Sequence, residues 1–93
     1  MRKIIKYSAV WCSPCKAFAP KFEKISKMEE FKDVEFLSLD IEDDESQESV
    51  EKYQIRNVPS VVITDNDGNI SKKIIGNIPE NDLINLIKEE LAK

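Results

Sequence analysis

The sequence predicts an α/β fold, with a mixed four-stranded sheet flanked by helices on both faces and elements in the order βαβαββα. Three observations predict it. Two short apolar runs near the N-terminus are separated by a long amphipathic segment, which is typical of parallel strands joined by a crossover helix. Two β-branched runs then flank a strong turn signal, which indicates an antiparallel hairpin. A second amphipathic segment closes the chain.

Residues 3–9 are the first predicted strand, because Ile4, Ile5 and Tyr7 form a short apolar run suited to a buried position. A helix is expected to open at Ser13 and Pro14, since proline in a first helical turn loses no needed hydrogen bond. Apolar side chains then recur at steps of three and four residues, which predicts one buried helical face. They are Phe18, Phe22, Ile25 and Met28.

Residues 34–41 are the second predicted strand, again because apolar side chains recur along a short segment. Asp44 and Gln47 have the spacing of a capping box, in which two side chains close the first turn of a helix. The spacing predicts a short helix that ends near Tyr53.

The C-terminal third is predicted as a hairpin followed by a helix. Residues 60–64 and 70–75 are the paired strands, and residues 66–69, which include Asp67 and Gly68, form the turn. A final helix is expected to begin at Pro79, with an apolar face made of Leu83, Ile84, Ile87 and Leu91.

Length and composition predict a single domain over residues 1–93, with 41% hydrophobic and 34% charged residues. The net charge is −4, and the acidic run over residues 40–45 is expected to be a solvated loop and helix start. This balance disfavours nucleic acid and anionic membranes as partners, because both select clustered lysine and arginine. Residues 1–7 lack the sustained apolar region of a signal peptide, so a cytoplasmic location is expected.

The chain has two cysteines, Cys12 and Cys15, and no histidine. A secreted disulfide scaffold has more cysteines, a structural zinc site needs four ligands, and haem attachment needs a histidine where Lys16 stands. Redox chemistry remains as the main interpretation. The spacing alone leaves open half of a metal site shared between two chains, or two inert buried thiols.

Cys12 lies at the start of the predicted helix, where unpaired N–H groups and the helix dipole favour a thiolate. Cys15 lies one turn later, close enough to form a disulfide, and is expected to be less exposed. Cys12 is therefore predicted to attack a substrate disulfide, and Cys15 to resolve the mixed disulfide that results.

The surrounding residues resemble the thioredoxin family over essentially the whole chain. Residues 9–16, AVWCSPCK, are similar to the family's A-x-W-C-G-P-C-K segment, and Pro20 stands where thioredoxins also carry a proline. Residues 52–60, KYQIRNVPS, are similar to K-Y-x-I-R-x-I-P-T, and Gly76 falls where thioredoxins have a glycine after the last strand.

The resemblance implies a thioredoxin-like fold and a thiol–disulfide oxidoreductase that reduces protein disulfides, with no metal and no tightly bound cofactor. It implies recycling by a thioredoxin reductase and a role in electron transport and cell redox homeostasis; nothing in the sequence demands more than a monomer. It implies a cis bond before Pro59, which would present the Val58 backbone to an extended substrate. The implied substrate-binding residues are Trp11, Ser13, Pro14, Val58, Pro59 and Gly76.

The sequence also departs from the family pattern. It starts later than a typical thioredoxin, so a trimmed form of the fold is expected. Ser13 replaces a glycine, Lys6 occupies the position of a buried aspartate, and Ser38 stands where thioredoxins carry the lysine that pairs with it. If the Lys6 ammonium lies near Cys15, both thiolates are favoured, and we expect a reduction potential less negative than the roughly −270 mV of a typical thioredoxin. The alternative is that Lys6 extends to solvent and has little effect.

Two other functions compete with this interpretation. A glutaredoxin-like protein recycled by glutathione is disfavoured by Trp11 and Lys16, because glutaredoxins usually carry a C-P-Y-C turn. A binding module with incidental redox chemistry is disfavoured by the intact cysteine pair, since a binder has no need of both sulfur atoms.

Overall fold

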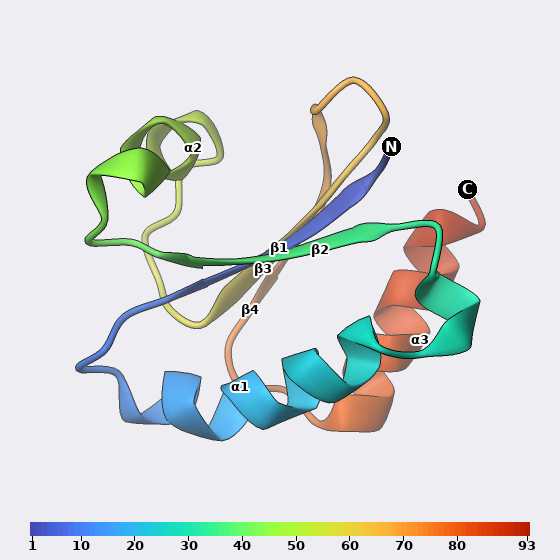
Figure 1. The fold of residues 1–93 in the computed structure, drawn as a ribbon, viewed down its shortest axis with the longest axis horizontal. Helices are drawn as coiled ribbons and strands as arrows, with labels where there is room; N and C mark the ends of the chain where they lie inside the picture. The colour runs from blue at the N-terminus through green and yellow to red at the C-terminus, as the bar shows by residue number, and fades with distance from the viewer.

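A mixed four-stranded sheet forms the centre of the computed structural model, which describes residues 1–93 (Figure 1). In spatial order its strands are β2 (Glu35–Asp40), β1 (Lys3–Ser8), β3 (Ser60–Thr64) and β4 (Ile70–Ile75). β1 pairs in parallel with β2, and β3 runs antiparallel to both β1 and β4. The predicted fold class, the parallel pair and the hairpin are thus confirmed.

Helices cover both faces of this sheet, as Figure 1 shows. The two long ones, α1 (Ser13–Ser26) and α3 (Glu80–Leu91), pack on one face. The short α2 (Gln47–Lys52) lies on the other face and is preceded by a 3-10 turn, η2 (Asp44–Ser46). A second 3-10 turn, η1 (Glu29–Phe31), joins α1 to β2. None of the helices combines the length and the hydropathy that a membrane span requires.

Alternation along the strands divides the apolar residues between two cores. In β1, Ile4 faces α1 and α3, whereas Ile5 and Tyr7 face the α2 side. The larger core joins the strands to both long helices; its buried members are Ile4, Phe18, Phe22, Ile25, Phe31, Val61, Ile63, Ile74, Leu83 and Ile87. The smaller core consists of Ile5, Tyr7, Tyr53, Ile55 and Val62.

The structure differs from the sequence prediction at two helix starts. Asp44 and Gln47 do not form the expected capping box: α2 begins at Gln47, and no side chain caps it. The Gln47 side-chain amide instead donates to the carbonyl oxygens of Ile41 and Asp43, at 2.7 and 2.9 Å, which holds the η2 turn. Pro79 is the N-cap of α3 rather than its first residue.

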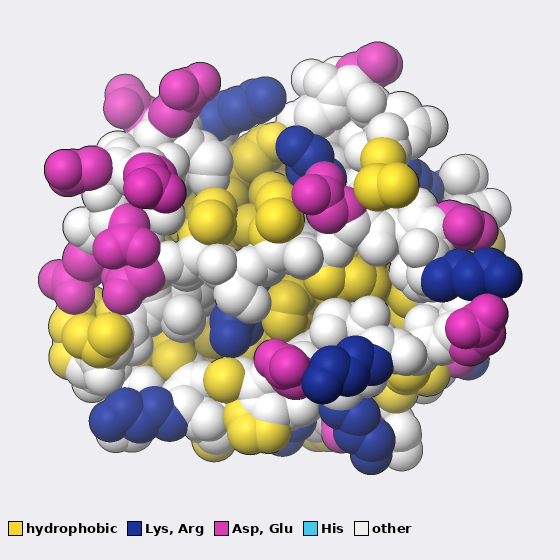
Figure 2. Space-filling model, in the orientation of Figure 1, with side chains coloured by type: hydrophobic (Ala, Val, Ile, Leu, Met, Phe, Trp, Pro, Cys, Tyr) yellow, Lys and Arg dark blue, Asp and Glu magenta, His cyan; other side chains and the backbone are white.

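The acidic run occupies the loop that leads into α2. Residues 42–45 are exposed, as expected for a solvated segment. In Figure 2, acidic side chains gather over the α2 end of the molecule.

Candidate active site

The two cysteines lie at the N-terminus of α1, immediately after the loop that leaves β1. Cys12 is the N-cap residue, and a disulfide joins it to Cys15, whose Cα atom is 5.2 Å away. The backbone N–H of Cys15 donates to the Cys12 Sγ at 3.2 Å. The first turn of the helix therefore directs an N–H group at the sulfur, as a thiolate there requires.

Both cysteines are buried in this disulfide form, with 5% of Cys12 and 4% of Cys15 exposed. Cys15 was expected to be the less exposed of the two, and in the oxidised protein the difference is only one percentage point. The two residues differ in their neighbours instead. Cys12 Sγ faces the Val58 carbonyl oxygen at 3.7 Å, whereas Cys15 lies inside the first helical turn.

The segment before β3 forms the other side of the site. The Val58–Pro59 peptide bond is cis; Pro59 is fully buried and Val58 is half-buried against the cysteines. The backbone N–H of Gly76 donates to the Pro59 carbonyl oxygen at 2.9 Å, so the end of β4 is tied to this segment. Gly76 has φ +100°, a conformation that residues with a Cβ rarely adopt.

Exposed side chains adjoin the buried cysteines along the chain. Trp11 is 63% exposed, and Ser13 and Pro14 are exposed beside it on the first turn of α1. Two further exposed apolar residues were not singled out from the sequence: Val10, 71% exposed, and Ile75, 54% exposed. Their signal was available, because Val10 precedes Trp11, and strand alternation in β4 turns Ile75 outward when Ile74 is buried.

Lys6 lies under α1 with only 8% of the residue exposed, so its side chain does not extend freely into solvent. Burial lowers the pKa of Lys6, and the negative charge of Glu23 partly opposes that shift. Ser38, its register partner on β2, is exposed.

The chain contains no cluster of three or more histidine, cysteine, aspartate or glutamate side chains arranged to hold a metal ion. The Cys12–Cys15 pair is a disulfide, and a disulfide can exchange its sulfur bond with thiols and with other disulfides.

Comparisons with known proteins agree over nearly the whole chain. The family model described as Thioredoxin matches residues 1–89. A thioredoxin from Mycoplasmoides gallisepticum is 36% identical over 85 residues, which cover 91% of this chain and 80% of that protein. The crystal structure of Malassezia sympodialis thioredoxin (Mala s 13) is similar, with a TM-score of 0.81, 29% identity and coverage of 96% of this chain and 75% of that one. The X-ray structure of Fasciola hepatica thioredoxin gives a TM-score of 0.79, 30% identity and coverage of 96% and 80%.

Proposed function

We propose that this chain, which belongs to the thioredoxin family and is a protein-disulfide oxidoreductase, works by attack of Cys12 on a substrate disulfide. The observation that carries the proposal is the Cys12–Cys15 disulfide across the first turn of α1, with Cys12 at the N-cap. This position supports a stabilised thiolate at Cys12 in the reduced protein, because the helix dipole and the N–H of Cys15 both favour negative charge there.

The proposed reaction has two exchange steps. The Cys12 thiolate attacks one sulfur of the substrate disulfide, forms a mixed disulfide and expels the other substrate sulfur as a thiolate, which takes a proton from water. The Cys15 thiolate then attacks Cys12 Sγ, closes the Cys12–Cys15 disulfide and expels the second substrate sulfur. Two electrons pass from the protein to the substrate.

The substrate surface is proposed to consist of the exposed residues around the disulfide. Val10, Trp11 and Ile75 offer apolar contacts, while Ser13 and Pro14 border Cys12. The Val58 backbone, which lies against Cys12, is suited to pair with an extended substrate segment. Pro59 and Gly76 are proposed to hold that backbone in place, through the hydrogen bond between them.

The physiological partners of the protein are proposed to be protein disulfides and a thioredoxin reductase. We further propose that the chain acts as a single monomeric domain in the cytoplasm, where it serves electron transport and cell redox homeostasis. The family membership supports the reductase over glutathione as the electron donor. Measuring turnover with each donor tests this point. Turnover with glutathione alone would contradict the proposed recycling while leaving the exchange chemistry intact.

Trapping of the mixed disulfide tests the proposed roles of the two cysteines. A Cys15→Ser variant retains the attacking sulfur but cannot resolve, so incubation with a disulfide-containing protein such as insulin should accumulate a covalent adduct. A Cys12→Ser variant is the matched control and should accumulate far less. Non-reducing mass spectrometry detects the adduct. The reverse pattern would show that Cys15 attacks first and would overturn the assignment.

A further inference from the structure

Lys6 is a buried lysine without a carboxylate partner. It lies in the middle of β1 with 8% of the residue exposed, and none of the five salt bridges includes it. Its Nζ makes no hydrogen bond within the protein and lies 5.6 Å from the centre of the Phe22 ring, within range of a cation–π contact. Lysines are almost never buried unless they are paired with an opposite charge. Stability of the fold therefore does not explain why a lysine is buried at position 6.

The ammonium of Lys6 keeps contact with water, and the Lys6 residue lines a hollow that Cys15 also lines. Every fully buried side-chain nitrogen and oxygen has a hydrogen-bond partner. Because Lys6 Nζ has none, it must retain some contact with solvent. Lys6 and Cys15 line the same open hollow of about 160 Å³, between the end of β1 and the first turns of α1. Water in this hollow can meet both side chains.

We propose that Lys6 is a positioning residue that stabilises the Cys15 thiolate in the reduced protein, through the positive charge that it holds beside this hollow. The inference rests on the proposed function, since it concerns the sulfur that resolves the mixed disulfide. The Cys15 thiol loses its proton to water in the hollow, Lys6 keeps its own proton, and the thiolate then attacks Cys12 Sγ as described above. A lysine beside a cysteine lowers the pKa of the thiol because it favours the charged form.

Other charges face Lys6 from the elements packed against it. On α1, Lys16 lines the hollow and Glu23 favours the charged form of Lys6; on β2, Asp40 lines the hollow. The β3 residue paired with Lys6 is Val61, which is uncharged. Asp40 opposes a Cys15 thiolate and Lys16 favours it. Lys16 is exposed, however, and charges in contact with solvent are screened. Lys6 is therefore the cation expected to act most strongly on Cys15.

Titration of Cys15 alone tests the proposal. In a Cys12→Ser background, thiolate absorbance against pH reports the ionisation of Cys15. Lys6→Met and Lys6→Gln should each lower its acid dissociation constant at least tenfold. Lys16→Met is the matched control, because it removes one positive charge from the rim of the same hollow, and its effect should be less than threefold. A Lys6 effect no larger than the Lys16 effect would overturn the proposal.

The reduction potential provides a second readout with both cysteines present. Thiolate formation stabilises the reduced state only above the pKa of Cys15. The wild-type and Lys6→Met potentials should therefore diverge as pH rises through the wild-type value, with wild type the less negative. A tenfold effect corresponds to about 30 mV at the plateau. Equal potentials at all pH values would contradict the proposal. A wild-type disulfide that fails to equilibrate with glutathione buffers would instead contradict the proposed function.

Discussion

At the residue scale, Ile75 is proposed to contribute to the recognition of a protein substrate but not to the sulfur chemistry. It ends β4 next to Gly76, and its register partner is Ser60, which follows Pro59. Its apolar surface therefore borders the segment that faces Cys12. A protein substrate can cover this surface, whereas a small disulfide cannot.

Changing Ile75 to serine should accordingly raise KM for a protein disulfide about fivefold, since about 1 kcal/mol of apolar burial is lost. Reduction of a small organic disulfide should be unchanged. Ile70→Ser is the control, because Ile70 is 47% exposed at the opposite end of the same strand. Steady-state kinetics of both variants with the protein disulfide and with the small disulfide measure these changes in KM. Equal effects of the two variants on KM would remove Ile75 from the substrate surface.

Lys6 also affects stability, and the sign follows from its lowered pKa. Desolvation penalises the charged form in the folded protein, so the unfolded chain binds the proton more tightly. Folded stability should therefore rise with pH between the folded pKa and the unfolded value of about 10.4. Lys6→Met should be more stable than wild type near pH 7, and this gain should shrink as pH rises toward 10. Urea unfolding at several pH values measures it; a constant difference would mean that the charge of Lys6 carries no penalty.

At the scale of helices and strands, the sequence predicts an element well when the contacts that form it join residues close together along the chain. β3 and β4 have the bounds that the sequence predicts, because β-branched runs end at Pro59, the 65–69 turn and Gly76. η1 carries no local periodic signal; the burial of Phe31 arises from its packing beside Phe36, a contact formed only in the folded chain.

The candidate site likewise combines residues that local motifs predict with features that arise only in the folded chain. Cys12, Cys15 and the Val58–Pro59 segment were identified from motifs, and the fold brings them together. The exposure of Ile75 follows from strand alternation, but its place next to the Val58–Pro59 segment depends on how the strands pair. The hollow shared by Lys6 and Cys15 likewise depends on how α1 packs on the sheet. Neither placement could be predicted from motif spacing, because spacing does not specify which side chains from other elements lie near the cysteines.

The short helix α2 depends on the sheet rather than on its own sequence. It has six residues, no side-chain cap and no buried member. Its main polar contact with the sheet is the hydrogen bond between Tyr7 of β1 and Ser49 of α2, whose oxygens are 2.5 Å apart. Isolated helices of this length are unstable in water, so α2 requires such contacts.

Tyr7→Phe should therefore lower the free energy of unfolding by about 1 kcal/mol and speed amide exchange chiefly within α2. Tyr53→Phe offers a comparison from the same core, because its hydroxyl donates to the Gly68 carbonyl oxygen at 2.6 Å. Its effect on exchange should fall in the turn around Gly68. Residue-resolved hydrogen exchange distinguishes the two. Uniform acceleration in both variants would mean that α2 unfolds only with the whole molecule.

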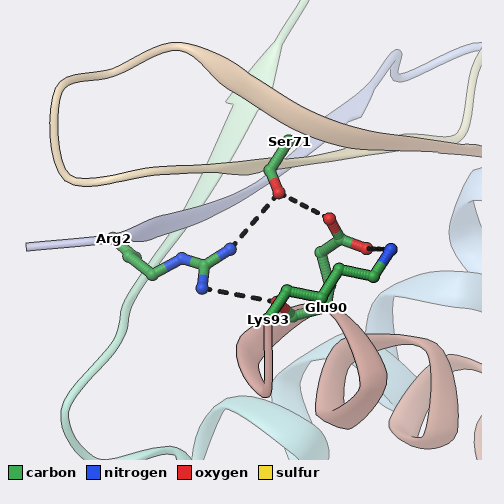
Figure 3. Close-up of polar contacts among 4 residues, drawn as sticks. All are labelled: Arg2, Ser71, Glu90 and Lys93. Carbon is green, nitrogen blue, oxygen red and sulfur yellow. Dashed lines mark hydrogen bonds and ion pairs between the residues drawn. The ribbon is translucent and has the colours of Figure 1, made fainter.

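On the scale of the whole molecule, a polar cluster joins the two ends of the chain on the side away from the disulfide (Figure 3). Ser71 of β4 donates to Glu90 Oε1 at 2.6 Å, and Lys93 Nζ lies 3.3 Å from Glu90 Oε2. Arg2 donates to Ser71 Oγ at 3.3 Å and to the Glu90 carbonyl oxygen at 3.4 Å. Glu90 thereby connects the start of β1, the beginning of β4 and the end of α3.

The hydrogen bond from Ser71, together with Lys93, holds the pKa of Glu90 below its usual range. Because the folded value is the lower one, the stabilising contribution is complete above the unfolded pKa of about 4.3 and is lost as pH falls through the folded value. Glu90→Gln should therefore be less stable than wild type at pH 7, and the difference should shrink in acid below about pH 4.

Glu89→Gln, at an exposed neighbouring position on α3, is the control and should show little change at either pH. Urea unfolding at pH 7 and pH 3 measures both variants. A Glu90→Gln deficit that is the same at the two pH values would show that its carboxylate charge does not hold the chain ends together.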